Sequence, residues 1–168
     1  GHAGPVVQDG KIYLHDYDSD NNTDVVRCLS LETAEEIWSY SYPVKIKTSH
    51  GITRCVPAIN KDHLVTFGPK CHISCFNPET GERKWTKSLV VDYGTKVPTW
   101  YAGQCPILEN GLVIRAPSGP EKMMVALNVE TGAEVWSTPN PEKWLMTHCS
   151  IGIMHVNGKK MYVYTGSG

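Results

Sequence analysis

The stretch Cys-Phe-Asn-Pro-Glu-Thr-Gly-Glu-Arg-Lys-Trp at residues 75–85 occurs in this chain in three related copies. The other two read Cys-Leu-Ser-Leu-Glu-Thr-Ala-Glu-Glu-Ile-Trp at 28–38 and Ala-Leu-Asn-Val-Glu-Thr-Gly-Ala-Glu-Val-Trp at 126–136, so the copies recur about every 50 residues. Repeats of this length are typical of propellers and solenoids, in which each repeat buries its apolar face only against its neighbours. The repeat by itself therefore predicts a propeller or solenoid architecture.

Each copy lies at the end of a series of four short predicted strands, separated by turns rich in Gly, Asn and Asp that tolerate a positive φ. Four antiparallel strands per repeat make a propeller blade. We therefore predict an all-β propeller, with blades at approximately residues 1–48, 49–97 and 98–146 and a half blade at 147–168. No stretch shows sustained helical periodicity, so no long helix is expected.

Three and a half blades do not form a closed ring. Propellers have about 4–8 blades and close to protect their sheet edges. We expect the remaining blades to come from a longer polypeptide or from other chains.

The bulk composition excludes several classes of partner. The 168 residues contain 16 Lys and Arg against 17 Asp and Glu, a formal net charge of −1, and no basic run. This balance does not favour binding to nucleic acid or to an anionic membrane surface. No apolar run approaches the roughly 18 residues that a membrane-spanning helix needs, so no membrane span is expected.

The repeated phrase resembles the tryptophan-docking motif of the pyrroloquinoline-quinone-type (PQQ-like) β-propeller repeat family, whose propellers usually have eight blades. The resemblance covers nearly the whole chain and implies a partial propeller of somewhat under half a ring. It further implies that Trp38, Trp85 and Trp136 pack between blades and that Gly81 and Gly132 hold the turns. The first copy departs from the pattern at Ala34, where the family has Gly.

The same resemblance implies two kinds of function. The family includes quinoprotein alcohol dehydrogenases and non-catalytic members similar to the outer-membrane assembly lipoprotein of Gram-negative bacteria. The catalytic members usually carry two adjacent cysteines beside the quinone, and this chain has no Cys-Cys dipeptide. We therefore favour a non-catalytic scaffold that binds a protein or small ligand. The alternative is a segment of a PQQ-dependent oxidoreductase for alcohols or sugars, with PQQ and calcium as cofactors. The resemblance also implies a bacterial protein exported to the periplasm or cell surface.

The candidate binding residues lie in the long connections between blades, at about residues 39–54, 86–104 and 137–148, because such loops cluster on one face of a propeller and often carry function. Aromatic, cationic and imidazole side chains there are suited to an anionic, quinone or sugar-like ligand. The candidates are His50, Arg54, Lys96, Trp100, Gln104 and His148. Ordinary loop packing, and a metal held by His2, His50 and His148, are the alternatives.

A second candidate is an acidic run with carboxylates at alternate positions, which is a pattern of calcium loops. It comprises Asp16, Asp18, Asp20 and Asp24. The central Gly and the terminal Glu of an EF-hand loop are missing, and the run falls between two predicted strands. A solvated hairpin and a weak calcium site both remain open.

The six cysteines allow three interpretations. Cys28 and Cys75 stand where the third repeat has Ala126, which suits small core residues. Cys71 and Cys75 are about 13 Å apart on an extended strand, too far for a disulfide. Core packing, a disulfide between blades and a metal site remain the alternatives, although no Cys-x-x-Cys pair favours a metal.

Overall fold

The computed structural model describes residues 3–47 and 54–167. In this part of the chain the fold is all-β, as the repeats predict. Three four-stranded antiparallel sheets and one two-stranded sheet follow one another along the sequence. Within each sheet, strands that are consecutive in sequence are hydrogen-bonded neighbours.

The strand bounds are as follows. The first sheet contains β1 (Val6–Gln8), β2 (Lys11–Asp18), β3 (Thr23–Ser30) and β4 (Glu36–Pro43). The second contains β5 (Ala58–Ile59), β6 (Leu64–Phe67), β7 (His72–Phe76) and β8 (Arg83–Ser88). The third contains β9 (Ile107–Glu109), β10 (Leu112–Arg115), β11 (Lys122–Asn128) and β12 (Glu134–Pro139). The two-stranded sheet contains β13 (Gly152–Val156) and β14 (Lys159–Val163).

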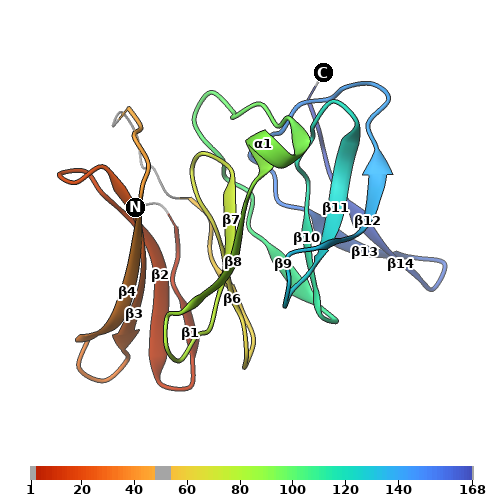
Figure 1. The fold of residues 1–168 in the computed structure, drawn as a ribbon. Coiled ribbons are helices and arrows are strands. Elements are labelled where there is room, and N and C mark those ends of the chain that lie inside the picture. Colours follow the sequence, from red (N-terminus) through yellow and green to blue (C-terminus); the bar gives the residue numbers. More distant parts are fainter. Residues whose placement is uncertain (1–2, 48–53, 168) are drawn as a thin grey trace.

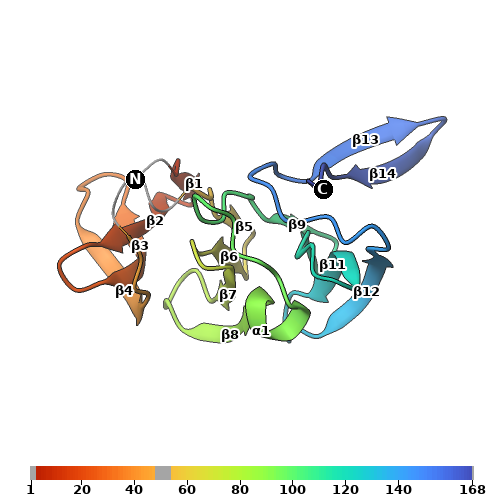
Figure 2. The ribbon, with the colours of Figure 1, turned by 90° about the horizontal axis from the view of Figure 1, so that it is seen from above.

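The sheets stand side by side like the blades of a fan (Figure 1). Seen from above, the first strands β1, β5 and β9 lie along the inner side of an arc, and the fourth strands β4, β8 and β12 lie on the outer side (Figure 2). The first strands contact one another from sheet to sheet. This arrangement is that of a partial β-propeller.

Short turn sequences set the hairpins between the first and second strands. Asp9-Gly10, Asn110-Gly111 and Asn157-Gly158 all have positive φ at both positions, from 49° to 76°. Two-residue turns of this type match the twist of the flanking strands, and Asn-Gly and Asp-Gly pairs adopt them readily. Local sequence therefore determines the first hairpin in these three sheets.

One short helix interrupts the pattern. Helix α1 (Leu89–Tyr93) follows β8 and begins at Ser88, whose side chain accepts a hydrogen bond from the Val91 backbone N–H. It ends at Gly94, which has a left-handed φ of 68°. A single helical turn has too few residues to show periodicity, so the sequence does not reveal it. The helix starts the connection that leads to the third sheet.

The hydrophobic core lies in the seams between sheets, and not at one centre. Tyr13, Val26 and Cys28 of the first sheet meet Leu64 and Phe76 of the second. A larger cluster joins the second and third sheets, and a smaller one joins the third sheet to β13–β14. A fully buried Leu or Phe contributes about 1.5–3 kcal/mol of transfer free energy. Each sheet is therefore stabilised by its neighbours.

The repeated tryptophans lie in these seams. The indole N–H of Trp38 donates to the Pro78 carbonyl oxygen at 2.9 Å, and that of Trp85 donates to the Val129 carbonyl oxygen at 2.7 Å. The Trp38 ring covers Gly81 so closely that a Cβ there would lie 2.6 Å from the ring. Gly132 lies under Trp85 in the same way, at 2.8 Å. Each of these two tryptophans therefore needs a glycine in the turn of the next blade.

Ala34 holds the equivalent turn position in the first blade, and its φ is 59°. The backbone of this turn thus matches that of Gly81 and Gly132 despite the side chain. An alanine in the left-handed region costs roughly 1–2 kcal/mol. The first turn is therefore strained.

We expect Ala34→Gly to raise the free energy of unfolding by about 0.5–1 kcal/mol, because relief of this strain exceeds the extra entropy of glycine in the unfolded chain. Urea denaturation measures the change. Ala133→Gly is the matched control, since Ala133 is exposed in the third turn and lacks a positive φ. It should lower stability slightly. An equal loss in both variants would contradict the strain at Ala34.

Two surfaces at the ends of the arc remain apolar. β13 and β14 expose Met154, Val156, Met161 and Val163. Val7 and Ile37 of the first sheet, and Leu31 just after β3, are also exposed. Within residues 3–47 and 54–167, no helix has the length and apolar character to cross a bilayer.

Candidate functional site

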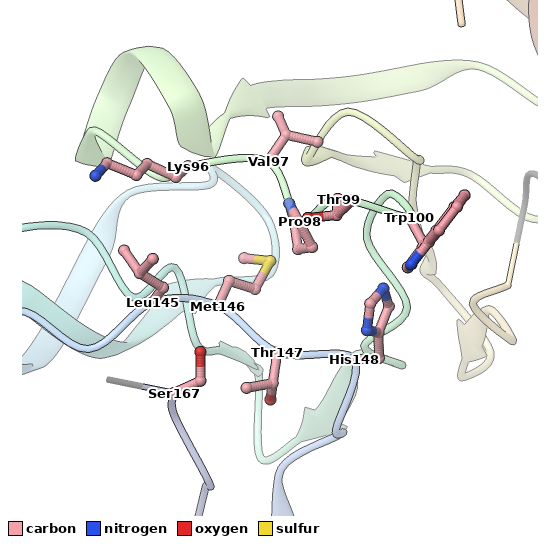
Figure 3. A pocket seen from close by; sticks show the side chains of 10 residues that line it. All are labelled: Lys96, Val97, Pro98, Thr99, Trp100, Leu145, Met146, Thr147, His148 and Ser167. Carbon is pink, nitrogen blue, oxygen red and sulfur yellow. The ribbon is translucent and has the colours of Figure 1, made fainter. Parts of the chain in front are cut away.

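A pocket of about 460 Å³ opens between two of the blade-connecting loops. One loop follows α1, and the other follows β12. Its lining residues are Lys96, Val97, Pro98, Thr99, Trp100, Leu145, Met146, Thr147, His148 and Ser167 (Figure 3). Three of the six predicted binding residues, Lys96, Trp100 and His148, therefore meet in one place.

The pocket has two different ends. Figure 3 shows the Trp100 and His148 rings close to each other at one end, and Lys96 at the other. Trp100 is 51% exposed, which is high for so large an aromatic side chain. An exposed indole beside an imidazole offers a flat surface on which a ring or an apolar side chain can stack.

The middle of the pocket mixes apolar and hydroxyl groups. Leu145 and Met146 lie between the two ends (Figure 3), and Thr99, Thr147 and Ser167 add hydroxyls. Among the described residues, none that lines the pocket is acidic, and Lys96 and His148 are the ionisable ones. This part of the lining favours an anionic or neutral ligand over a cationic one.

Hydrogen bonds hold the Trp100 loop in place. The Thr95 hydroxyl donates to the Pro117 carbonyl oxygen at 2.8 Å, and the Tyr101 N–H closes a turn onto the Pro98 carbonyl oxygen at 2.9 Å. The Tyr101 hydroxyl in turn accepts from the Lys47 N–H at 2.7 Å, which links this loop to the connection after β4. The side of the pocket that carries Trp100 is thus well ordered by its own contacts.

The opposite loop is anchored by Asn140, which is 3% exposed. Its amide donates to the Gly119 and Trp144 carbonyl oxygens, at 2.8 and 2.9 Å. Further along, the Thr147 N–H donates to the Tyr164 hydroxyl at 2.8 Å. These bonds fix the His148 side of the pocket before any ligand arrives.

Gln104, another predicted binding residue, lies beneath the pocket and not in its lining. It is 1% exposed, and its amide donates to the Ala116 carbonyl oxygen at 3.1 Å and to the Tyr164 hydroxyl at 2.9 Å. Tyr164 also accepts from Thr147, so a chain of hydrogen bonds joins Gln104 to the pocket wall. In this arrangement Gln104 positions the loop through its contacts within the chain.

Sequence reasoning missed Arg115, which is fully buried at the end of β10. Its guanidinium carbon lies 3.7 Å from the centre of the Phe67 ring, and one N–H group donates to the Gln104 carbonyl oxygen at 3.0 Å. Its Nε and Nη2 have no hydrogen-bond partner in the described chain. Burial lowers the pKa of Arg115 to about 10. The sequence did contain one signal for Arg115: it ends the otherwise apolar strand sequence Leu-Val-Ile-Arg.

Arg54, a further predicted binding residue, is not among the residues that line this pocket. Arg54 is half-buried just ahead of β5. His50 and His2 lie outside the described residues, so a metal held by His2, His50 and His148 stays a prediction.

The four aspartates of the calcium alternative do not gather around one point. Asp18 accepts from the Asp20 and Asn21 backbone N–H groups and caps the hairpin turn, which lowers the pKa of Asp18 chiefly through its bonds to Asn21. Asp24 is fully buried and pairs with His15 at 2.9 Å. In residues 3–47 and 54–167 no group of three His, Cys, Asp or Glu side chains is placed to hold a metal ion. The acidic run is a hairpin with one buried carboxylate.

All six cysteines are free thiols in this structure. Cys28, Cys55, Cys71 and Cys75 are buried, Cys105 is half-buried and Cys149 is exposed. Burial raises the pKa of Cys55, Cys71 and Cys75 to about 12. These positions accord with core packing for the buried four.

Comparison with known proteins extends the repeat argument. A family model described as "Outer membrane protein assembly factor BamB" matches residues 1–89 and 21–168, which together cover the chain. A search of curated proteins with this chain found no match.

Solved structures share the fold at low identity. BamB from Moraxella catarrhalis is 15% identical, with a TM-score of 0.53, and the match covers 82% of this chain and 36% of that one. Quinohemoprotein alcohol dehydrogenase from Comamonas testosteroni is 21% identical, with a TM-score of 0.60, over 82% and 21%. A europium-containing methanol dehydrogenase is 19% identical, with a TM-score of 0.59, over 81% and 24%. The chain thus spans well under half of each of these structures.

Proposed function

Because the chain belongs to the PQQ-type β-propeller repeat family, we propose that it is part of a non-catalytic binding scaffold whose loop pocket holds a protein segment or small ligand. The observation that carries the proposal is the meeting of Lys96, Trp100 and His148 in one pocket between two anchored loops. Trp100 would supply most of the contact area, and Lys96 would favour a negative group on the ligand.

The preformed loops support a binding role for the pocket. A site whose walls are fixed by internal hydrogen bonds loses little conformational entropy when a ligand enters. We also propose export to the cell envelope, because the family description names an outer-membrane assembly factor.

The alternative function is a segment of a quinoprotein oxidoreductase. Trp100 could stack against a quinone, and Lys96 could contact its carboxylates, which favours this candidate. Calcium, the metal that the resemblance implies, lacks a ligand set in the described residues. The ultraviolet–visible spectrum of the natural full-length protein separates the two functions, because only the oxidoreductase should carry a quinone band and gain stability from calcium.

Trp100→Ala should weaken binding of the natural partner by tenfold or more, because truncation of a central aromatic contact typically costs about 1–2 kcal/mol or more. Pull-down from the envelope fraction of the source cells, followed by titration of the protein that is retained, measures the loss. Folding should not change, since half of the Trp100 surface is already exposed.

Trp144→Ala is the matched control. Trp144 is 44% exposed on the neighbouring loop but is not among the residues that line the pocket. Equal binding losses in both variants would place the binding surface elsewhere on the loop face.

A further inference from the structure

Two cysteines of neighbouring blades each contact the backbone of the segment that carries the other. The Cys55 thiol lies just ahead of β5 and is directed to the Ala102 carbonyl oxygen, with a sulfur–oxygen distance of 3.8 Å. Ala102 lies three residues before Cys105. In return, the Cys105 sulfur accepts a hydrogen bond from the Val56 N–H at 3.3 Å. Val56 directly follows Cys55, so each thiol faces the segment that carries the other.

This reciprocal arrangement limits the distance between the two residues. A backbone nitrogen lies about 2.4 Å from the preceding Cα by standard geometry. The Cys105 sulfur is therefore within about 6 Å of the Cys55 Cα. Disulfides join Cα atoms that are about 4.4–6.8 Å apart. The Cys105 sulfur lies about 2.8 Å from its own Cα, so the two Cα atoms are at most about 8.5 Å apart, a limit that includes the disulfide range. A bond between the two cysteines requires rotation of both side chains.

We propose that Cys55 and Cys105 form a disulfide that joins the second and third blades at their innermost strands. The bond would close a loop of about 50 residues and add a covalent link to the packing and hydrogen bonds that already join these two blades. Because residues 102–105 follow Trp100 and Tyr101 directly, it would also fix the base of the loop that carries Trp100. The proposal does not depend on what the pocket binds.

The chemistry needs an external oxidant of the disulfide class, such as oxidised glutathione or an exchange enzyme. Cys105 is the more accessible thiol and attacks that disulfide first, releasing one thiol and forming a mixed disulfide. The Cys55 thiol then loses its proton and displaces the second thiol, which completes the protein disulfide. Two electrons and two protons leave the protein pair and end on the two released thiols.

Two features around Cys55 act in opposite directions on its attack on the mixed disulfide: burial slows it and Arg115 assists it. Burial raises the pKa of Cys55 to about 12, while the nearby Arg115 guanidinium opposes this rise. Arg115 also interacts electrostatically with Cys71 and Cys105. A cation that interacts with three thiols, and whose Nε and Nη2 atoms lack hydrogen-bond partners among the described residues, stabilises the thiolate that closes the bond. Oxidation during folding, before the seam is fully packed, avoids much of the burial penalty.

The test is oxidation of the natural full-length protein carrying Cys149→Ser, which removes the exposed thiol. The protein is incubated with oxidised glutathione, unfolded, alkylated at its free thiols and analysed by peptide mass mapping. We expect one linked peptide pair containing Cys55 and Cys105, lighter by two hydrogen atoms, with Cys28, Cys71 and Cys75 alkylated. Full alkylation of Cys55 and Cys105 would overturn the proposal, and so would linkage of Cys55 to Cys71.

Melting temperature gives a second readout. Reduction of the oxidised protein should lower it by about 5 °C or more, from the usual effect of a disulfide on a domain of this size. Cys105→Ser should remove this sensitivity to reductant, whereas Cys75→Ala, a buried cysteine in β7, should keep it. A reductant-sensitive melting point that survives Cys105→Ser would also contradict the pairing.

Discussion

Trp85→Ala is expected to lower the free energy of unfolding by about 3–5 kcal/mol, the usual cost of truncating a large aromatic side chain in a core. Trp85 pairs with Cys75 in its own sheet and packs against the cluster that joins the second and third blades. The variant would leave a cavity in that seam and free the Val129 carbonyl oxygen from its bond to the indole. Chemical denaturation measures the change.

Two further variants separate the contributions. Trp85→Phe keeps most of the packing and loses the hydrogen bond, so we expect a smaller loss, of about 1–2 kcal/mol. Gly132→Ala should be strongly destabilising alone, because its Cβ would lie 2.8 Å from the Trp85 ring.

In the Trp85→Ala background the same change should cost less, since only the backbone strain at a φ of 70° remains. A cost of Trp85→Ala below about 1 kcal/mol would mean that this residue does not join the blades.

Asp24→Ala is the second large expected effect, also about 3–5 kcal/mol. Asp24 and His15 are both fully enclosed in the seam between the first two sheets, and the Tyr42 hydroxyl donates to the same carboxylate. The carboxylate contributes, after burial, to raising the pKa of Tyr42. Gly68 lies so close that a Cβ would overlap with both Tyr42 and Asp24. Removing the carboxylate would leave the buried Tyr42 hydroxyl without its acceptor and would take away the group that lies 2.9 Å from the enclosed His15 ring.

The control is Asp18→Ala, which removes a carboxylate from the exposed hairpin of the same acidic run. It should cost no more than about 0.5–1 kcal/mol, the usual value for a turn or cap hydrogen bond. Both variants are measured in calcium and in chelator. A calcium-dependent stability that is lost in both would instead support the calcium site that the sequence left open.

The acidic run shows why spacing alone did not settle its role. Successive residues of a strand point to opposite faces, so carboxylates at every second position share one face only if the strand continues. Here the chain reverses after Asp18, and Asp24 returns on β3 facing the second sheet. Its partner His15 lies on β2, and Gly68 belongs to the next blade. A pattern within one segment does not contain these contacts.

By itself, the sequence determined the blades. Turn pairs such as Asp9-Gly10 set their own backbone angles, and the alternation of strand residues and the recurring tryptophan reflect interactions repeated in every unit. Only the tertiary structure decided the site. Lys96, Trp100 and His148 come from connections of adjacent blades and meet because the blades stack, while Gln104 is drawn beneath them and Arg115 is buried against Phe67. Turns and strands are specified by short stretches of sequence because their stabilising interactions are between residues close in the chain. The contacts of a site depend on how separate loops and strands pack against one another.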